Sequence, residues 1–179
     1  MKKSIFLLLA MIMVTGSSLV AGDKVEMSPQ KNIMQNAAAT PELSTLVAAL
    51  KASGLDKMLE SAGPYTLLAP KNDAFTDLPK GTWETLMKPE NKEQLKKVLE
   101  FHILAGKWTT DDLKKKIAES KGVADITTLE GSKLHIADHN GMHLMIRDDD
   151  DDMGMFNSWD LAQSNGVIHV IDNVMMPKP

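Results

Sequence analysis

Cysteine is absent from the 179-residue chain, so disulfides and a cysteine nucleophile are excluded and stability must come from a packed core. Arginine is almost absent too, because Arg147 is the one arginine among 20 basic residues. Guanidinium groups make the bidentate contacts that recognise phosphates and base edges, so we expect no nucleic-acid partner. Aromatic residues are 4% of the chain, which leaves few rings to line a pocket for a large apolar ligand.

The sequence also lacks the motifs of common catalytic sites. It contains no G-x-S-x-G, no H-E-x-x-H and no glycine-rich phosphate loop. Aspartate and histidine are frequent, but their abundance alone does not define a Ser-His-Asp site. We therefore expect a protein that is not an enzyme and has no obligatory cofactor.

The N-terminus has the pattern of a secretory signal peptide. Two lysines precede an apolar run of about ten residues, and small residues follow it. The run is too short to span a bilayer about 30 Å thick, and an uncleaved anchor is the alternative. We predict a signal peptide at 1–22, a linker at 23–30 and a single domain at 31–179. The domain is expected to be secreted or periplasmic, without stable membrane insertion.

A strongly β-forming stretch lies near the C-terminus. Val167 to Ile171 is β-branched apart from His169, and Val174 to Met176 is apolar again. Both faces of such a strand are apolar, which predicts burial on two sides. Asn165-Gly166 before it is a turn pattern, and Pro177 cannot extend the ladder. We therefore expect the fold to close on this strand.

Other elements are predicted from periodicity. Apolar residues recur at helical spacing over 43–50 and 55–62, with Thr40-Pro41 starting the first helix. A later helix is predicted to start at 110–113. Strands are predicted at 65–69, 124–129, 133–137, 142–147 and 156–162, with a hairpin turn at 138–141.

Three short segments occur in an order that resembles one known family. Thr66 to Phe75 contains Ala-Pro and Asn-Asp-Ala-Phe, Phe101 to Leu104 places a histidine before a strand, and Asn165 to Pro177 is the third. They resemble the boxes of the fasciclin (FAS1) domain, with mild departures such as a methionine pair before the last proline. The resemblance implies an α+β class with the FAS1 fold, a compact twisted β-sandwich or wedge with several short helices packed around it.

The resemblance also implies structural roles for box residues. These are Asn72, Asp73, Phe75, His102, Asn165, Gly166, His169 and Asp172. The two histidines lie inside strand motifs, so we expect their ring nitrogens to be hydrogen-bonded in the core and not to act chemically. Asn72 and Asp73 are expected to form a cap and a turn.

A segment outside the boxes, 135–155, is rich in residue types that bind metals. It holds three histidines, four methionines and five consecutive aspartates. A solvated acidic loop on a hairpin accounts for this composition. The alternative is a site for copper, through imidazole and thioether groups, or for Ca²⁺, through carboxylates. The candidate ligands are His135, His139, His143, Asp149, Asp151 and Asp160.

Neither metal is matched fully by the sequence pattern. Asp149, Asp151 and Asp160 would take positions 1, 3 and 12 of a calcium loop, but Met153 stands where an oxygen ligand is needed. For copper, a hairpin would place one of the three histidines in its turn. Convergence of the donors is therefore not implied by their spacing.

Asp160-Leu161 occupies the place of an Asp-Ile pair through which animal fasciclin proteins contact integrins, so the resemblance implies a candidate contact surface there. A signal peptide of bacterial type implies that no integrin is present. We expect an exported interaction or adhesion module that contacts a protein or polysaccharide at the cell surface, in a matrix or in a biofilm, as a monomer or weak oligomer. Two alternatives stay open: an envelope metal-binding protein that uses 135–160, and a carrier of an apolar, carotenoid-like ligand.

Overall fold

The computed structural model describes residues 27–148 and 150–178, so the predicted signal peptide and residues 23–26 of the predicted linker lie outside the described residues. The helices are α1 (Ile33–Ala38), η1 (Pro41–Leu43), α2 (Ser44–Ser53), α3 (Asp56–Glu60), α4 (Asn72–Thr76), α5 (Thr82–Leu86), η2 (Pro89–Asn91), α6 (Lys92–Phe101) and α7 (Thr110–Glu119). The strands are β1 (Tyr65–Pro70), β2 (Ile103–Ala105), β3 (Val123–Thr127), β4 (Lys133–His139), β5 (His143–Arg147), β6 (Met153–Gln163) and β7 (Gly166–Ile171).

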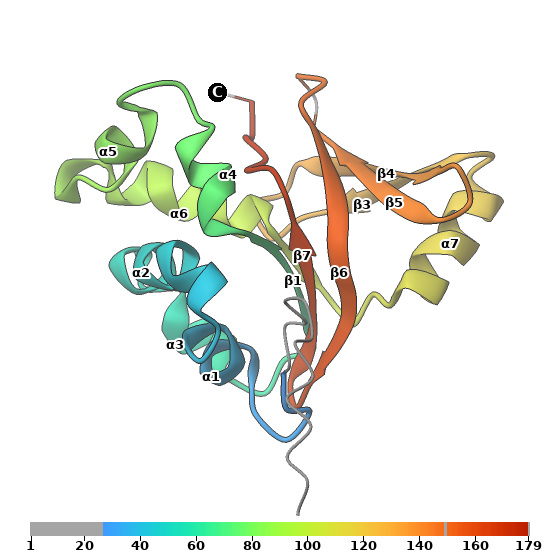
Figure 1. Ribbon diagram of the computed structural model, residues 1–179, viewed down its shortest axis with the longest axis horizontal. Coiled ribbons are helices and arrows are strands. Elements are labelled where there is room, and N and C mark those ends of the chain that lie inside the picture. Colours follow the sequence, from blue (N-terminus) through green and yellow to red (C-terminus); the bar gives the residue numbers. More distant parts are fainter. Residues whose placement is uncertain (1–26, 149, 179) are drawn as a thin grey trace, which may run out of the picture.

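The strands of the described residues form one sheet in the order β2-β1-β7-β6-β5-β4-β3. Neighbours are antiparallel except β1 and β7, which are parallel. The long strand β6 joins two halves: its first residues pair with β5, and after two register shifts its later residues pair with β7. In Figure 1, helices α1 to α6 cover the β1–β7 side and α7 lies beside β3 and β4, which gives a wedge with the sheet at its centre.

The sheet contributes to two apolar cores. One core packs the early helices against β1 and β7, with Leu67 and Ile168 among its members. The other lies among β3 to β6 and α7 and includes Phe156 and Leu113. Every residue of β7 is buried, and the strand supplies side chains to both cores. The prediction of a C-terminal strand buried on two sides is therefore confirmed, as is the α+β class.

One helix was not predicted, and two local predictions differ in part from the structure. Residues 33–38 form α1, a helix too short for apolar spacing to indicate, which begins at a capping box made by Asn32. Thr40 stands at the N-cap position before Pro41 as predicted, but its hydroxyl donates to the Asn36 carbonyl at 2.9 Å and makes no capping hydrogen bond. The last strand ends at Ile171, so the apolar run at 174–176 is not part of it; the chain bends at 172–173.

The described end of the predicted linker packs on the domain. The Ser28 backbone N–H donates to the Asn36 side chain at 3.0 Å, and the Gln163 amide lies 3.2 Å from the sulfur of Met27. Over residues 27–148 and 150–178, no helix has the length and apolar character needed to cross a membrane.

Candidate functional site

The first of two buried histidines, His102, ends α6 and is 1% exposed. Its Nδ1 donates to the Val98 carbonyl at 2.8 Å, and its Nε2 accepts from the Met175 N–H at 3.0 Å. Only a neutral ring can make both contacts. Burial lowers the pKa of His102 to about 4, with the Val98 hydrogen bond acting weakly in the other direction. Both nitrogens of this ring are therefore used within the fold.

The second buried histidine, His169, lies in the middle of β7. Its Nε2 donates to the Trp108 carbonyl at 2.7 Å, and its Nδ1 accepts from the Asp160 N–H at 3.2 Å. Burial lowers the pKa of His169, while the Trp108 contact and the Asp160 charge partly oppose that shift. The His169 ring therefore links β7 to the β2–α7 loop, which carries Trp108.

Trp108 is held from three sides. Besides the His169 contact, its backbone N–H donates to the Thr66 hydroxyl at 2.8 Å, and that hydroxyl donates to the Gly106 carbonyl at 2.8 Å. Its indole Nε1 donates to the Ala105 carbonyl at 3.0 Å. The side chain is half-buried, so one part of the ring system is fixed while another part faces solvent.

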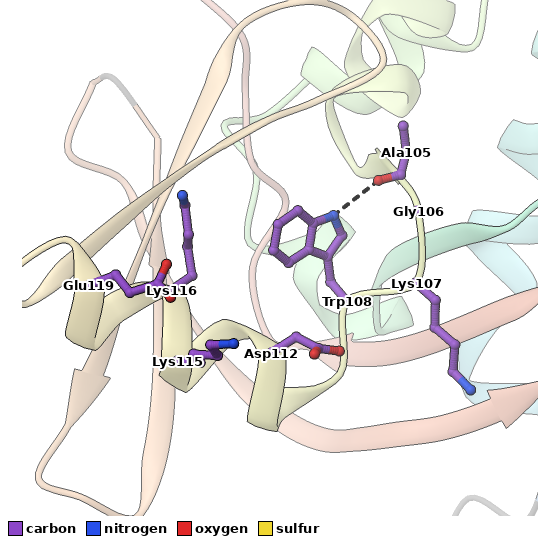
Figure 2. A pocket seen from close by; sticks show the side chains of 8 residues that line it. All are labelled: Ala105, Gly106, Lys107, Trp108, Asp112, Lys115, Lys116 and Glu119. Atoms are coloured by element: carbon purple, nitrogen blue, oxygen red, sulfur yellow. Dashed lines mark hydrogen bonds between the residues drawn. The ribbon is translucent and has the colours of Figure 1, made fainter.

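The exposed part of this indole forms a wall of an open groove with a volume of about 440 Å³. Figure 2 shows the groove between the β2–α7 loop and α7, with the Trp108 side chain between the lysines of the loop and of the helix. The lining residues are Ala105, Gly106, Lys107, Trp108, Asp112, Lys115, Lys116 and Glu119.

Among the charged groups of the groove, Asp112 has hydrogen-bond partners, whereas the lysines have no nearby carboxylate in the described part of the chain. The side chain of Asp112 accepts from the Thr109 hydroxyl at 2.6 Å and the Thr109 N–H at 3.1 Å. These hydrogen bonds lower the pKa of Asp112, and the charges of Lys115 and Lys107 act in the same direction. In the described part of the chain, none of the groove lysines 107, 115 and 116 lies within 4.0 Å of a carboxylate oxygen. Their ammonium groups remain available to a ligand.

Asp160 and Leu161 are both engaged inside the domain. The Asp160 carboxylate accepts from the Thr110 N–H at 2.8 Å and from the Thr110 hydroxyl, so it anchors the start of α7. Leu161 pairs with Ile168 and packs against the first core. Both residues therefore make contacts that stabilise the fold. The partner-contact surface predicted for them is not tested and stays a prediction.

The three hairpin histidines lie on one face of β4 and β5. His139 pairs with His143 on the rung next to the turn, whereas His135 pairs with Arg147 at the far end. The turn itself is 140–142, so it contains no histidine, contrary to the expectation from spacing. His135 and His139 are four strand residues apart, about 13 Å. The Nδ1 of His135 lies 2.8 Å from a carboxylate oxygen of Asp125.

The acidic segment is organised around its first residue. Asp148 is 1% exposed, and its Oδ1 accepts from the Asp150 and Asp152 N–H groups at 3.0 Å. The Asp151 carboxylate lies 2.9 Å from the Arg147 guanidinium, and Asp149 lies outside the described residues. Within the described ranges, no three His, Asp or Glu side chains are grouped so that they could hold a metal ion. The site predicted from these residue types is therefore not assembled there from imidazoles and carboxylates alone.

The first box connects two helices. The Asn72 side chain does not cap its own helix; it accepts from the Thr45 N–H at 3.0 Å and donates to the Pro41 carbonyl at 3.0 Å, so it holds the start of α2. Asp73 lies in the first turn of α4. Phe75 is buried, with its ring centroid 4.6 Å from that of Trp83.

The last box joins the chain ends of several elements. The buried side chain of Asn165 accepts from the Ile33 N–H at 2.9 Å and donates to the Leu59 and Ser61 carbonyls at 2.7 Å. Gly166 begins β7 directly beside Tyr65 of β1. The Asp172 carboxylate accepts from the Met155 N–H at 2.6 Å and thereby ties the end of β7 to β6.

Sequence reasoning missed the Trp108 groove. Its local pattern is a tryptophan after Gly-Lys, followed by a capped helix with three consecutive lysines at 114–116. That pattern could have indicated a basic, aromatic surface. It could not have shown that Thr66 and His169, distant in sequence, hold the backbone of Trp108.

The wedge, with a parallel β1–β7 pair inside an otherwise antiparallel sheet and two flanking helical layers, defines the class of protein. It matches the structure of a FAS1 domain pair from the insect cell adhesion molecule fasciclin I with a TM-score of 0.72 at 19% identity, covering 82% of this chain and 51% of that one. The chain belongs to the fasciclin domain family, whose model matches residues 41–177. The resemblance found in the three boxes is confirmed.

Relatives come from bacteria and from animals. One protein of Synechocystis sp. is 39% identical over 145 residues, which are 81% of this chain and 73% of that protein. A second one is 35% identical over the same length and is covered to 97%. Transforming growth factor-beta-induced protein ig-h3 from Sus scrofa is 33% identical over 155 residues, but this chain spans only 21% of its length.

Proposed function

We propose that this protein is an exported, non-enzymatic interaction module, and that the Trp108 groove holds a segment of an acidic polysaccharide at the cell surface or in a surrounding matrix. The observation that carries the proposal is the position of Trp108 at the mouth of a lysine-lined groove, where one hydrogen bond holds the indole and two hold the backbone of the residue. The secretory leader predicted from the sequence and the fold shared with an insect cell adhesion molecule support the same assignment.

A fixed indole suits a sugar ring because both surfaces are flat and partly apolar. Aromatic side chains bury a large area per residue, and tryptophan is enriched at the centres of binding surfaces for that reason. Ordering a mobile side chain costs free energy on binding. Trp108 avoids most of that cost, because its backbone and its Nε1 are already bonded.

The lysines add selectivity for acidic units. The full chain has a formal net charge of −4, yet lysines 107, 115 and 116 all line the groove that contains Trp108. Lysine is a compact charge that can pair with carboxylate or sulfate groups without fixed geometry. Attraction between such exposed charges is screened by salt, so binding should weaken as ionic strength rises.

The Asp112 carboxylate of the groove does not favour glycoside hydrolysis. A hydrolase of that kind needs one carboxylic acid whose pKa is raised so that it can protonate the leaving oxygen. The pKa of Asp112 is instead lowered by its hydrogen bonds from Thr109. Asp112 is therefore not suited to protonate a leaving glycosidic oxygen.

The test is calorimetric titration of the purified protein with oligomers of polygalacturonic acid, and with maltoheptaose as the uncharged comparison. We expect saturable binding of the acidic oligomers only. Trp108→Leu keeps the backbone contacts to Thr66 and His169 but removes the indole, and it should weaken binding about 30-fold, the effect of losing a central aromatic contact.

The role of the lysines is tested by removing two lysine charges in the groove and, as a matched control, two lysine charges outside it. Lys115→Gln combined with Lys116→Gln should weaken binding and flatten its salt dependence, whereas Lys51→Gln with Lys97→Gln, on exposed faces of α2 and α6, should not. Absence of binding to the acidic oligomers, or equal binding by Trp108→Leu, would refute the groove assignment. The carrier hypothesis for an apolar ligand stays a separate prediction, tested by the visible absorbance of protein from its native source.

A further inference from the structure

A second groove, with a volume of about 820 Å³, lies on the outer face of the β4–β6 sheet. The loop between α4 and α5 forms its opposite wall, and the chain that follows β7 crosses it. Its lining has an unusual composition, because four thioethers and one imidazole face the same space. These donors are Met145, Met153, Met155, Met176 and His139.

Strand register places Met145 at the centre of these donors. Met145 of β5 is the direct partner of Met155 of β6, and Arg147, two residues on from Met145, is the direct partner of Met153. On the other side, Met145 pairs with Ala137, two residues from His139 on the same face of β4. Direct partners have Cβ atoms about 4.5–5.5 Å apart and diagonal neighbours are about 7–8 Å apart, within the reach of long side chains.

Hydrogen bonds from other residues hold the backbone of the methionines outside β5. The Asp172 carboxylate accepts from the Met155 N–H at 2.6 Å. The Asn173 amide donates to the Met153 carbonyl at 2.9 Å. The second oxygen of the buried Asp148 accepts from the Met176 N–H at 3.1 Å. These three methionines are therefore held at their backbones, although thioether side chains are themselves flexible.

We propose that this groove binds one Cu(I) ion through the thioethers of Met145, Met153 and Met155, with the sulfur of Met176 as the fourth donor. Soft thioether donors select Cu(I) over hard cations. His139 lines the same groove but lies too far from Met153 for both to bind one ion. Ca²⁺ and Mg²⁺ require oxygen ligands, and of the aspartates 77, 152 and 172 that also line the groove, Asp172 already accepts from the Met155 N–H. Among the described residues no group of three His, Asp or Glu side chains offers a competing site.

The proposal is independent of the Trp108 groove, which shares no lining residue with this one. It also differs from the donor set suggested by composition. The donors in the groove are methionines, one of which comes from beyond β7, and not the histidines and aspartates.

The test is anaerobic titration of the purified protein with Cu(I) in competition with the chromophoric chelator bicinchoninate. One equivalent of Cu(I) should be retained by the protein. Met145→Leu with Met155→Leu should lower the affinity by more than the roughly 10–100-fold that follows loss of an indirect partner of a metal site. Leucine conserves volume and apolar character, so the fold should survive the change.

Met142→Leu is the matched control, because this methionine is 71% exposed at the hairpin tip and does not line the groove. Its Cu(I) affinity should equal that of the parent protein. A second measurement does not depend on variants: the methyl carbon resonances of the groove methionines should shift on Cu(I) addition while that of Met142 does not. Failure to retain Cu(I) against the chelator, unchanged affinity in the double variant, or unshifted groove methyls would each overturn the site.

Discussion

Two Asn-Gly dipeptides connect strands in this protein, and they behave in opposite ways. Asn140-Gly141 lies at the exposed tip between β4 and β5, and Asn165-Gly166 lies at the buried connection between β6 and β7. The same two residues therefore support a free hairpin tip in one half of the sheet and the joint of the whole fold in the other.

The buried connection is fixed by contacts from distant elements. The Asn165 side chain hydrogen-bonds to the start of α1 and to the end of α3. It thereby satisfies one backbone N–H and two backbone carbonyls. Gly166 has a φ of 159°, a positive value that L side chains rarely adopt. Space is a second constraint, because a Cβ there would collide with the carbonyl oxygen of Tyr65 on the parallel strand β1.

The exposed tip is fixed only by local geometry. Asn140 and Gly141 have φ of 60° and 74°, in the left-handed region that these two residues tolerate. A Cβ on Gly141 would meet no atom within 4 Å. The comparison shows that a turn pattern in the sequence reports local backbone shape, whereas its energetic weight depends on what packs around it.

The largest expected effect comes from adding one methyl group at each glycine. Gly166→Ala should destabilise the domain by more than about 4 kcal/mol or prevent folding, since the atoms in the way belong to the backbone of β1. Gly141→Ala should cost only about 1–2 kcal/mol, the penalty of a left-handed conformation. Urea unfolding followed by circular dichroism measures both, and similar costs at the two glycines would break the comparison.

Replacing the asparagines should give the next largest difference. Asn165→Ala leaves an N–H and two carbonyls without their partners around a buried position, which should cost about 4 kcal/mol at roughly 1–3 per orphaned group with some relief by water. Asn140→Gly should change stability by less than about 0.5 kcal/mol, because glycine adopts the same φ freely. The same unfolding measurement decides, and a small loss in Asn165→Ala would contradict the role given to its side chain.

The sequence predicted well those features that a few neighbouring residues determine. The apolar run at 167–171 identified β7, and the tandem helices α2 and α3 followed from spacing. Sites formed by residues that are distant in the sequence could not be predicted from it. Trp108 depends on Thr66 and His169, which are 42 and 61 residues away, and the methionine groove depends on the register of three strands. Register and long-range packing are set by the whole chain, so residue types alone suggested a metal site but not its donors.

The free energy of unfolding should fall as the pH drops from about 6.5 to 4. The pKa of His102 is about 4 in the folded state and about 6.5 in the unfolded state, so the unfolded state binds the proton more tightly. The contribution of the neutral His102 ring to the free energy of unfolding is about 3 kcal/mol. It is fully present above pH 6.5 and is lost as the pH falls toward 4. The lowered pKa of His169 acts in the same direction. Unfolding free energies between pH 7 and 4 measure this loss.

A His102→Gln variant separates this effect from general acid sensitivity. It should be less stable than the parent at pH 7, because the contacts with Val98 and Met175 are altered. Its stability should nevertheless fall less steeply between pH 6.5 and 4, because one group with a lowered pKa is gone. An equally steep fall in the two proteins would show that another group controls the acid response.

The smallest effect is expected at the exposed tip. The Asp138 carboxylate accepts from the Gly141 N–H at 2.7 Å, and both residues are exposed, so Asp138→Ala should cost about 0.5–1 kcal/mol. The Cu(I) affinity of the neighbouring groove should stay within about twofold, because the His139–His143 rung remains paired and the β6 methionines are held from the β7 side by Asp172 and Asn173. A larger loss of stability together with loss of Cu(I) would mean that the tip sets the register of β4 and β5. In that case the free hairpin tip would be as important a joint as the buried one, and the difference between the two Asn-Gly dipeptides would disappear.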